Sequence, residues 1–211
     1  MHRRLIASLG LVLRLARARM EGVTPHQQYS SSIGVPGCLI DTNRVAYFPT
    51  QPSCTEPCVR IMHPESERQL TLLHIDRSGG AYDISYDAWN YLKSGAGAKE
   101  GPETGAAVNM EIVPVALDDE QCQALLEQTG GKIPNMAISP NWVIEMCADM
   151  DKVVFYNFMT QSCTIGSDEV CQLDGQVMKC PRGVGAVDDY DGPTVTDIAY
   201  GTGEDVPSPE A

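Results

Sequence analysis

The sequence predicts a mainly β fold that is stabilised by disulfide bonds and carries a small helical insert. Short runs of alternating or β-branched apolar residues are bounded by proline and glycine, which is typical of strands and their turns. Eight cysteines are spread through the body of the chain, an even number that predicts a disulfide framework. With 211 residues, of which 43% are apolar, the chain can form one domain with flanking segments.

Residues 1–18 are expected to be a secretory signal peptide. A basic start precedes the apolar run "LIASLGLVL" at 5–13, and Ala16 and Ala18 give an A-x-A arrangement. An apolar run of this length is too short to span a bilayer, so we expect no membrane anchor. The arginines after the run also suit a mitochondrial presequence or a misassigned start, but the cysteine content favours secretion.

The arm and the strands are expected in this order. Residues 19–37 are polar and rich in Ser, Gln, Pro and Gly, which predicts a flexible N-terminal arm. Strands are predicted near 39–48, 57–63 and 68–76, and in the third we expect alternate residues to lie on opposite faces. "RSGG" then turns the chain.

A helix is expected after this turn, with Ser85 as its cap and Gly95 as its end. Ala88, Trp89 and Leu92 would face inward. A glycine-rich loop over 94–107 leads to the strand "VNMEIVPVAL".

A helical insert is predicted over 117–150, followed by a final strand in "KVVFYNFM". Its first helix would be capped by Asp118 and stopped by Gly130, and the second would have proline in its first turn. The domain would span 38–180. Residues 181–211 are acidic, with several glycines and prolines and little apolar periodicity, which predicts a disordered acidic tail.

The cysteines could pair in many ways, and the sequence does not choose among them. A bridge between Cys122 and Cys147, one in each predicted helix, is our first guess. Metal binding through Cys54, Cys58 and histidines is disfavoured, because no second CxxC or HxxxH partner exists, so we expect no metal and no cofactor. The eight expected disulfide cysteines are Cys38, Cys54, Cys58, Cys122, Cys147, Cys163, Cys171 and Cys180.

The net charge of −13 argues against nucleic acid as a partner, since phosphate binding needs a positive surface. An acidic surface would also disfavour an acidic polysaccharide and suit a neutral glucan, chitin or a basic protein. No G-x-S-x-G elbow or phosphate loop is present.

Asp76 and Asp83 are the main candidates for a site, because they flank the glycine turn and could face one groove. Two carboxylates on opposite sides of a bond are what glycoside hydrolysis requires. The alternative is that both aspartates accept hydrogen bonds from turn amides. His74 alternates with leucines, which is more typical of a satisfied core histidine.

The segment "DRSGGAYDISYDAWNYL" at 76–92 resembles the core of the six-stranded double-psi β-barrel. That barrel is shared by expansins, rare lipoprotein A, barwin, cerato-platanins and family 45 glycoside hydrolases. The match is good over 58–92 and extends over 38–115 when "TNRVAYFP" and "VNMEIVPV" are included. The insert and final strand added to this core look like small secreted proteins of filamentous fungi.

The resemblance implies that Asp83 is the groove aspartate, which acts as general acid in those members that catalyse. Tyr47 would contact sugar, although its spacing is looser than in the family. The catalytic base that family 45 enzymes place just after this tyrosine is missing, because Phe48, Pro49 and Thr50 follow it. Asp76, Tyr82 and Tyr86 would complete the groove, with Tyr86 and Tyr91 as exposed stacking groups and Trp89 in the core.

Three functions remain open. The first is a secreted, monomeric, non-hydrolytic protein that binds cell-wall polysaccharide or a host component, as expansin-like proteins do. The second is a lytic glycan-cleaving enzyme that uses Asp83 as its acid. The third is a secreted protease inhibitor or effector that acts on a host protein through the loop 94–107.

Overall fold

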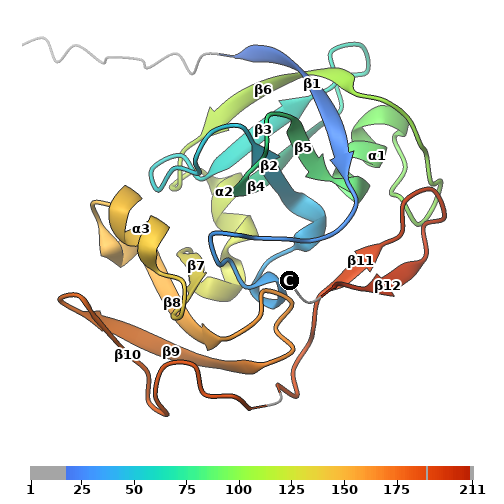
Figure 1. The fold of residues 1–211 in the computed structure, drawn as a ribbon. Coiled ribbons are helices and arrows are strands. Elements are labelled where there is room, and N and C mark those ends of the chain that lie inside the picture. The colour runs from blue at the N-terminus through green and yellow to red at the C-terminus, as the bar shows by residue number, and fades with distance from the viewer. Residues whose placement is uncertain (1–17, 189, 210–211) are drawn as a thin grey trace, which may run out of the picture.

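The computed structural model describes residues 18–188 and 190–209, and the expected signal peptide therefore lies outside the described residues except for Ala18. Six strands close into a barrel in the order β1-β5-β2-β4-β3-β6, which forms the upper part of the molecule in Figure 1. Their bounds are β1 Arg19–His26, β2 Val45–Phe48, β3 Cys58–Met62, β4 Gln69–Arg77, β5 Tyr82–Ser85 and β6 Val108–Val115.

The pairing in this barrel is mixed. β1 runs parallel to β5 and β2 runs parallel to β4, whereas the other neighbours are antiparallel. Each parallel pair joins strands that are not consecutive in the chain, so connections must cross the barrel ends. The prediction of a mainly β fold with a closed six-stranded barrel is confirmed, and the mixed pairing is compatible with the double-psi arrangement.

Strand β4 follows the predicted alternation. Leu70 and Leu72 pack in the barrel core, while Leu73 and Ile75 pack in a second apolar cluster outside it. Because neighbouring side chains of a strand point to opposite faces, one strand serves both cores. This two-sided burial explains why "LTLLHI" reads as an almost continuous apolar run.

Helix α1 (Tyr86–Ser94) covers one end of the barrel and confirms the predicted helix. Gly95 ends it in the left-handed conformation, with φ of 93°, which glycine adopts without the penalty of a Cβ. Ser85 occupies the capping position, but its side chain makes no capping hydrogen bond. Trp89 is fully buried and its indole N–H donates to the Val23 carbonyl at 3.1 Å, so the helix is fastened to β1.

The flexible arm expected over 19–37 is wrong. Residues 19–26 form strand β1, which pairs with both β5 and β6 and so closes the barrel. Tyr29, Ile33 and Val35 are buried in the second apolar cluster. The sequence "RMEGVTPH" hides the strand, because it has few apolar residues and contains Pro25, and proline argues against a strand.

A second sheet has the order β10-β9-β8-β7 and lies below the barrel in Figure 1. Its strands are β7 Ile133–Met136, β8 Val153–Phe158, β9 Gly166–Asp174 and β10 Val177–Lys179, and the short helices α2 Glu120–Leu125 and α3 Asn141–Met146 precede or interrupt them. The insert over 117–150 is therefore only partly helical. The strand β8, expected to be the last, is followed by further strands.

The tail expected to be disordered is also ordered where the structure describes it. Strands β11 (Thr196–Ile198) and β12 (Asp205–Pro207) form a hairpin that packs beside the loop after α1 (Figure 1). Val195 and Ile198 are buried in two different clusters. Tyr200 packs on Tyr86, with ring centroids 4.9 Å apart.

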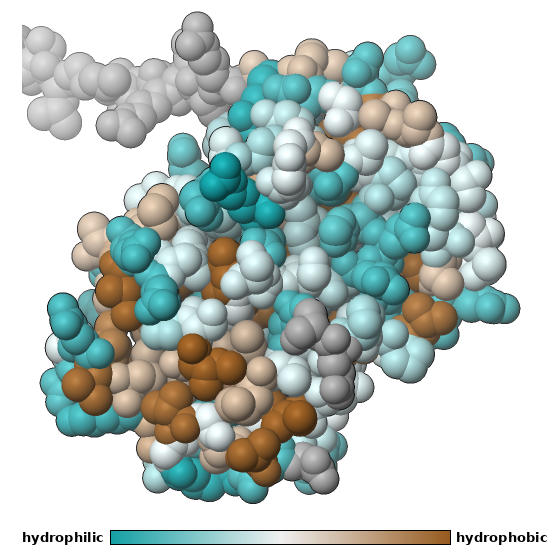
Figure 2. Space-filling model, in the orientation of Figure 1, coloured by the Kyte–Doolittle hydropathy of each residue, from teal (hydrophilic) through white to brown (hydrophobic). Residues whose placement is uncertain are grey.

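Figure 2 shows the molecule in the orientation of Figure 1. On the face that is visible there, hydrophobic residues gather over the second sheet, whereas the surface over the barrel is mainly hydrophilic. Val170 and Val177 in that sheet are more than half exposed. Within 18–188 and 190–209, no helix is both long and apolar enough to cross a membrane.

Four disulfides join all eight cysteines, which confirms the predicted framework and corrects the pairing that we guessed. Cys122 bonds Cys58 and Cys147 bonds Cys54, so each insert cysteine is tied to the barrel side of the chain and not to the other helix. The remaining bridges are Cys38–Cys163 and Cys171–Cys180. Such a framework is typical of an oxidising compartment.

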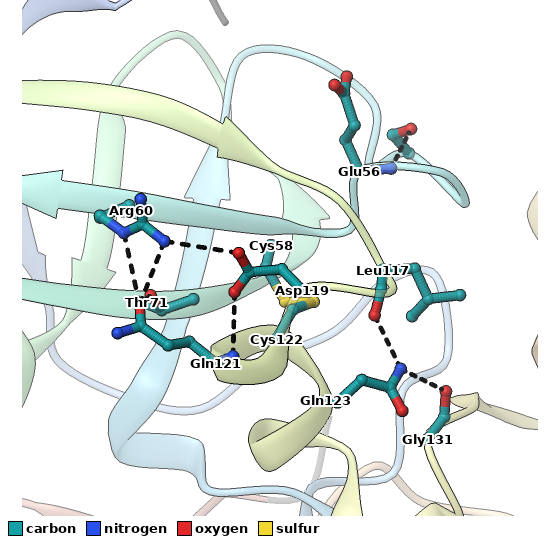
Figure 3. The surroundings of a disulfide bond; sticks show 11 residues. Glu56, Cys58, Arg60, Thr71, Leu117, Asp119, Gln121, Cys122, Gln123 and Gly131 are labelled. Atoms are coloured by element: carbon teal, nitrogen blue, oxygen red, sulfur yellow. Dashed lines mark hydrogen bonds and ion pairs between the residues drawn. A yellow bond between two sulfur atoms is a disulfide. The ribbon is translucent and has the colours of Figure 1, made fainter.

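Polar contacts surround the Cys58–Cys122 bridge (Figure 3). The Thr71 hydroxyl donates to Gln121 Oε1 at 2.7 Å, and the Arg60 guanidinium lies 3.7 Å from the Asp119 carboxylate. Asp119, and not the expected Asp118, caps α2 by accepting from the Gln121 amide. The bridge therefore holds α2 against β3 and β4.

Candidate functional site

The strand register brings the main sequence candidates together. Asp83 on β5 is level with Thr24 on the parallel strand β1 and with Tyr47 on the antiparallel strand β2. Tyr47 is in turn level with Asp76 on β4. Because paired residues on neighbouring strands have Cβ atoms roughly 5 Å apart, these four residues form one row across the barrel wall.

Asp83 is the accessible carboxylate of this row. Its side chain is half-buried, and the Thr24 hydroxyl donates a hydrogen bond to Oδ1. This bond fixes the carboxylate while Oδ2 has no hydrogen bond to a described residue. An oriented carboxylate with a free oxygen can accept a hydroxyl or amine donor from a ligand.

Asp76 has a different surrounding. It is buried, and its carboxylate accepts from the Ser32 amide, from the Ser32 hydroxyl at 2.7 Å and from the Arg77 amide at 2.7 Å. Both oxygens are thus used to hold the segment after β1 against β4. Asp76 therefore has a structural role beside the row. This agrees with the alternative interpretation of the sequence, in which Asp76 accepts hydrogen bonds from backbone amides.

His26 extends the row on β1. Its ring lies against Tyr47, with centroids 4.0 Å apart, and a ring nitrogen is 3.3 Å from the Ser30 hydroxyl. Burial lowers the pKa of His26, and the carboxylates of Asp83, Asp197 and Asp76 partly oppose that shift. The ring is thus neutral at neutral pH and can exchange donor and acceptor roles.

A small pocket adjoins this row. Its lining residues come from several elements, among them His26 of β1, Tyr47 of β2, Ser85 of β5, Tyr86 of α1 and Asp197 of β11. Its lining is His26, Gln27, Gln28, Tyr29, Thr42, Asn43, Tyr47, Ser85, Tyr86, Asp87, Asp197 and Ile198. Asp83 is not part of this lining but shares a strand face with Ser85, two residues along β5.

Tyr47 is buried, and its hydroxyl accepts from the Ser30 amide at 3.4 Å. Burial raises the pKa of Tyr47 well above that of a free tyrosine, so the phenol keeps its proton and can donate it in a hydrogen bond. Tyr29, behind it, is likewise buried with a raised pKa and donates to the Val35 carbonyl at 2.7 Å.

The two expected stacking groups, Tyr86 and Tyr91, are not exposed: Tyr91 is half-buried and packs against the barrel core. Tyr86 is 3% exposed, and its hydroxyl donates to the Glu103 carbonyl at 2.8 Å, so the expectation of an exposed Tyr86 is wrong. Tyr82 is half-buried on the opposite face of β5 from Asp83, under the Arg19 guanidinium at 4.8 Å. Buried tyrosines and a histidine ring thus supply the aromatic lining of the pocket: Tyr29, Tyr47, Tyr86 and His26.

Three site residues escaped the sequence analysis. Thr24 and His26 lie in the segment taken for a flexible arm, and Asp197 lies in the segment taken for a disordered tail. One signal for the latter was available: the glycine-containing turn "YGTGED" separates the β-branched segment "TVTDIA" from Val206, which is compatible with a hairpin. The acidic composition of the surrounding tail outweighed it.

The row can bind but lacks a second free carboxylate in the position expected for a hydrolase base. Phe48, next to Tyr47, is buried in the barrel core. Within the described residues, no group of three or more His, Cys, Asp or Glu side chains is arranged to hold a metal ion. The arrangement thus offers one oriented carboxylate, hydroxyls and amides, which suits hydrogen bonding to a polar ligand.

Comparison of the chain with family models, with curated proteins and with solved structures gives no match.

Proposed function

We propose that this protein is secreted and binds a cell-wall polysaccharide without hydrolysing it. Binding would occur at the row of residues around Asp83 and the small pocket beside it, which are together called the groove. The observation that carries the proposal is the half-buried Asp83 carboxylate, oriented by Thr24 in a row of polar groups on three neighbouring strands. Sugar hydroxyls are donors and acceptors, and a fixed carboxylate accepts from them strongly. Pre-orientation lowers the entropic cost of binding.

Two features support binding over hydrolysis. Of the two aspartates on this row, Asp76 is engaged by three internal donors, so Asp83 is the one left to meet a ligand. Inverting and retaining glycosidases both need two carboxyl groups facing the scissile bond. Secretion is supported by the four disulfides, which form and persist in oxidising compartments.

Replacing Asp83 with alanine is expected to weaken polysaccharide binding by roughly 10- to 100-fold, since a hydrogen bond to a charged group contributes about 1.5–3 kcal/mol. The measurement is a pull-down of the oxidised protein on insoluble cellulose, chitin, xylan and β-1,3-glucan, with soluble sugars analysed in every supernatant. Asp191→Ala is the matched control, because Asp191 is exposed and its replacement removes the same charge.

Each outcome is informative. Binding that is lost in Asp83→Ala and kept in Asp191→Ala, with no sugar released, supports the proposal. Release of oligosaccharides that stops in Asp83→Ala would replace it with the lytic enzyme. Equal binding of the wild type and Asp83→Ala would contradict any role for the groove.

A protease inhibitor or effector is the second candidate, because the exposed loop 94–107 is held in one conformation. Asn90 Nδ2 donates to the carbonyls of Ala96 and Gly101, both at 2.9 Å, and Lys93 Nζ donates to the Thr104 carbonyl at 2.8 Å. A pre-ordered exposed loop loses little entropy on binding another protein. Inhibition in a panel of cysteine proteases, unaffected by Asp83→Ala, would favour this candidate.

A further inference from the structure

The pocket beside Asp83 has hydrogen-bonding atoms that the protein does not use. Asp197 is 7% exposed, and while its Oδ1 accepts from the Tyr29 amide at 2.8 Å, its Oδ2 has no partner among the described residues. Ser85 is 6% exposed, and its hydroxyl also has no partner there. Buried polar atoms are almost always paired in native proteins. Both residues line the pocket, but neither unpaired atom has accessible surface, so an occupant of the pocket pairs with them after a small rotation of the two side chains.

The pocket is small. Its cavity volume is about 10 Å³ for the centre of a water-sized group, which corresponds to roughly one such group. An ammonium group is of this size and offers three donors, which suit a carboxylate oxygen and a hydroxyl that both lack a partner. An acetamido group is too large for this volume.

The charge around the pocket is unbalanced. Asp197 lines it, Asp83 and Asp76 stand beside it, and its described lining contains no lysine or arginine. Arg44, which lies nearby, is engaged by the Asp87 carboxylate at 2.8 Å. Burying a carboxylate without a positive partner is costly, so an occupant that brings a positive charge would be bound more tightly than water.

The rest of the lining favours a sugar as the carrier of that charge. Gln27, Gln28, Thr42 and Asn43 surround the pocket with amides and a hydroxyl, which match ring hydroxyls. The methylene stem of a lysine would also find apolar contacts, because Tyr29, Tyr47, Tyr86 and Ile198 line the pocket, so a capped lysine is the control that separates the two carriers. The row around Asp83 lies within one sugar ring of the pocket, since Ser85 and Asp83 are two residues apart on one strand.

We propose that the pocket formed by Asp197 and Ser85 takes the primary ammonium group of an amino sugar, so that the preferred ligand is a glycan with free amino groups. This inference rests on the proposed function and names the ligand class of the same groove. Asp197 Oδ2 and the Ser85 hydroxyl accept from the ammonium group, while Asp83 accepts from hydroxyls of a neighbouring ring.

The test compares three soluble pentasaccharides by calorimetry at about 0.15 M salt, where surface charges more than roughly 8 Å apart are screened. They are the β-1,4-linked pentamers of glucosamine, N-acetylglucosamine and glucose. The wild type is expected to bind the glucosamine pentamer at least tenfold more tightly than the other two. Asp197→Asn keeps the acceptor for the Tyr29 amide and should abolish that preference, so that the variant binds the glucosamine pentamer no more tightly than it binds the glucose pentamer.

Two controls separate the pocket from the general acidity of the chain. Asp191→Asn removes the same charge from an exposed position and should keep the preference, whereas Ser85→Ala, which removes an unpaired hydroxyl, should reduce it several-fold. Equal losses in Asp197→Asn and Asp191→Asn would overturn the inference, because they would show diffuse attraction only.

The remaining outcomes distinguish this inference from the proposed function. Binding of all three pentamers with equal affinity, lost in Asp83→Ala, would overturn the amino-sugar inference and leave the polysaccharide proposal standing. Failure of every pentamer to bind would overturn both. Binding of a capped lysine as tight as that of the glucosamine pentamer, and dependent on Asp197, would overturn the inference in favour of a basic peptide.

Discussion

Replacing Cys58 and Cys122 with alanine is expected to lower the free energy of unfolding by about 4 kcal/mol, from the loop-entropy relation for a sequence separation of 64. That amount is a large share of the roughly 5–15 kcal/mol that stabilises a typical domain. Both sulfurs are fully buried, so the cavity left by the change adds to the loss. Urea unfolding followed by circular dichroism measures the difference.

The Cys171–Cys180 bridge provides the matched control. It closes a sequence separation of 9 within the β9–β10 hairpin, for which the same relation gives only about 2.5 kcal/mol. The double alanine variant of this pair should therefore keep the barrel folded with a smaller loss. An equal or larger loss from the hairpin bridge would show that the barrel does not depend on the tie between β3 and α2.

Acid is expected to destabilise the fold by about 3 kcal/mol between pH 7 and pH 4 through His74 alone. Burial lowers the pKa of His74 from 6.5 to about 4, the Asp76 carbonyl partly opposes this shift, and the Arg19 charge adds to it. His74 is 7% exposed, and its Nε2 lies 2.9 Å from that carbonyl. It thus behaves as the neutral core histidine expected from the sequence.

The two pKa values of His74 determine that falling pH lowers the stability of the folded protein. In the unfolded chain His74 takes up a proton as pH falls through about 6.5, whereas in the folded protein it does so near 4. Between these values the unfolded state binds the proton more tightly, so stability is full above about pH 6.5 and falls as pH drops towards 4.

The variant His74→Gln isolates this contribution, because its amide can donate to the Asp76 carbonyl but does not titrate. Unfolding free energies of both proteins at pH 7, 5.5 and 4 are the measurement. The wild type should lose about 3 kcal/mol more than the variant. Parallel pH profiles, or a His74 ring signal that titrates near pH 6.5 by NMR, would disprove the buried neutral histidine.

The central part of the fold could be predicted because its signals are local. In "RQLTLLHID" the alternation around Leu72 and Leu73 follows the strand period, and the Ser85 to Gly95 segment carries a helix with its stop. The row around Asp83 was partly predictable for the same reason, since Asp76 ends the first of these segments and Asp83 lies two residues before the second.

The ends of the domain could not be predicted, because their order comes from distant contacts. Strand β1 is stabilised by pairing with residues about 60 and 90 positions further along, as in Val23 level with Tyr82 and Arg19 level with Ile112. Asp197 reaches the site because its carboxylate accepts from Tyr29, 168 positions away. Composition alone predicts that both segments are flexible or disordered, since polar residues, prolines and glycines dominate them.

The prediction of the disulfide pairing was wrong for a related reason. Helix α2 contains Cys122, and Cys147 directly follows α3. The two cysteines pack on different parts of the chain: Cys122 lies in the cluster with Cys58, and Cys147 in the cluster with Cys54. Proximity in sequence between two helices does not bring them together when an intervening strand, β7, joins a separate sheet.

The most direct test of the central claim, that the groove around Asp83 binds glycan, is to map binding on the backbone. Amide signals of the isotopically labelled protein would be followed by NMR during titration with the soluble pentasaccharides. The account predicts that shifts concentrate on 24–30, on 83–86 and around Asp197, and that Asp83→Ala removes them. Shifts confined to the loop 94–107 or to the second sheet would contradict it.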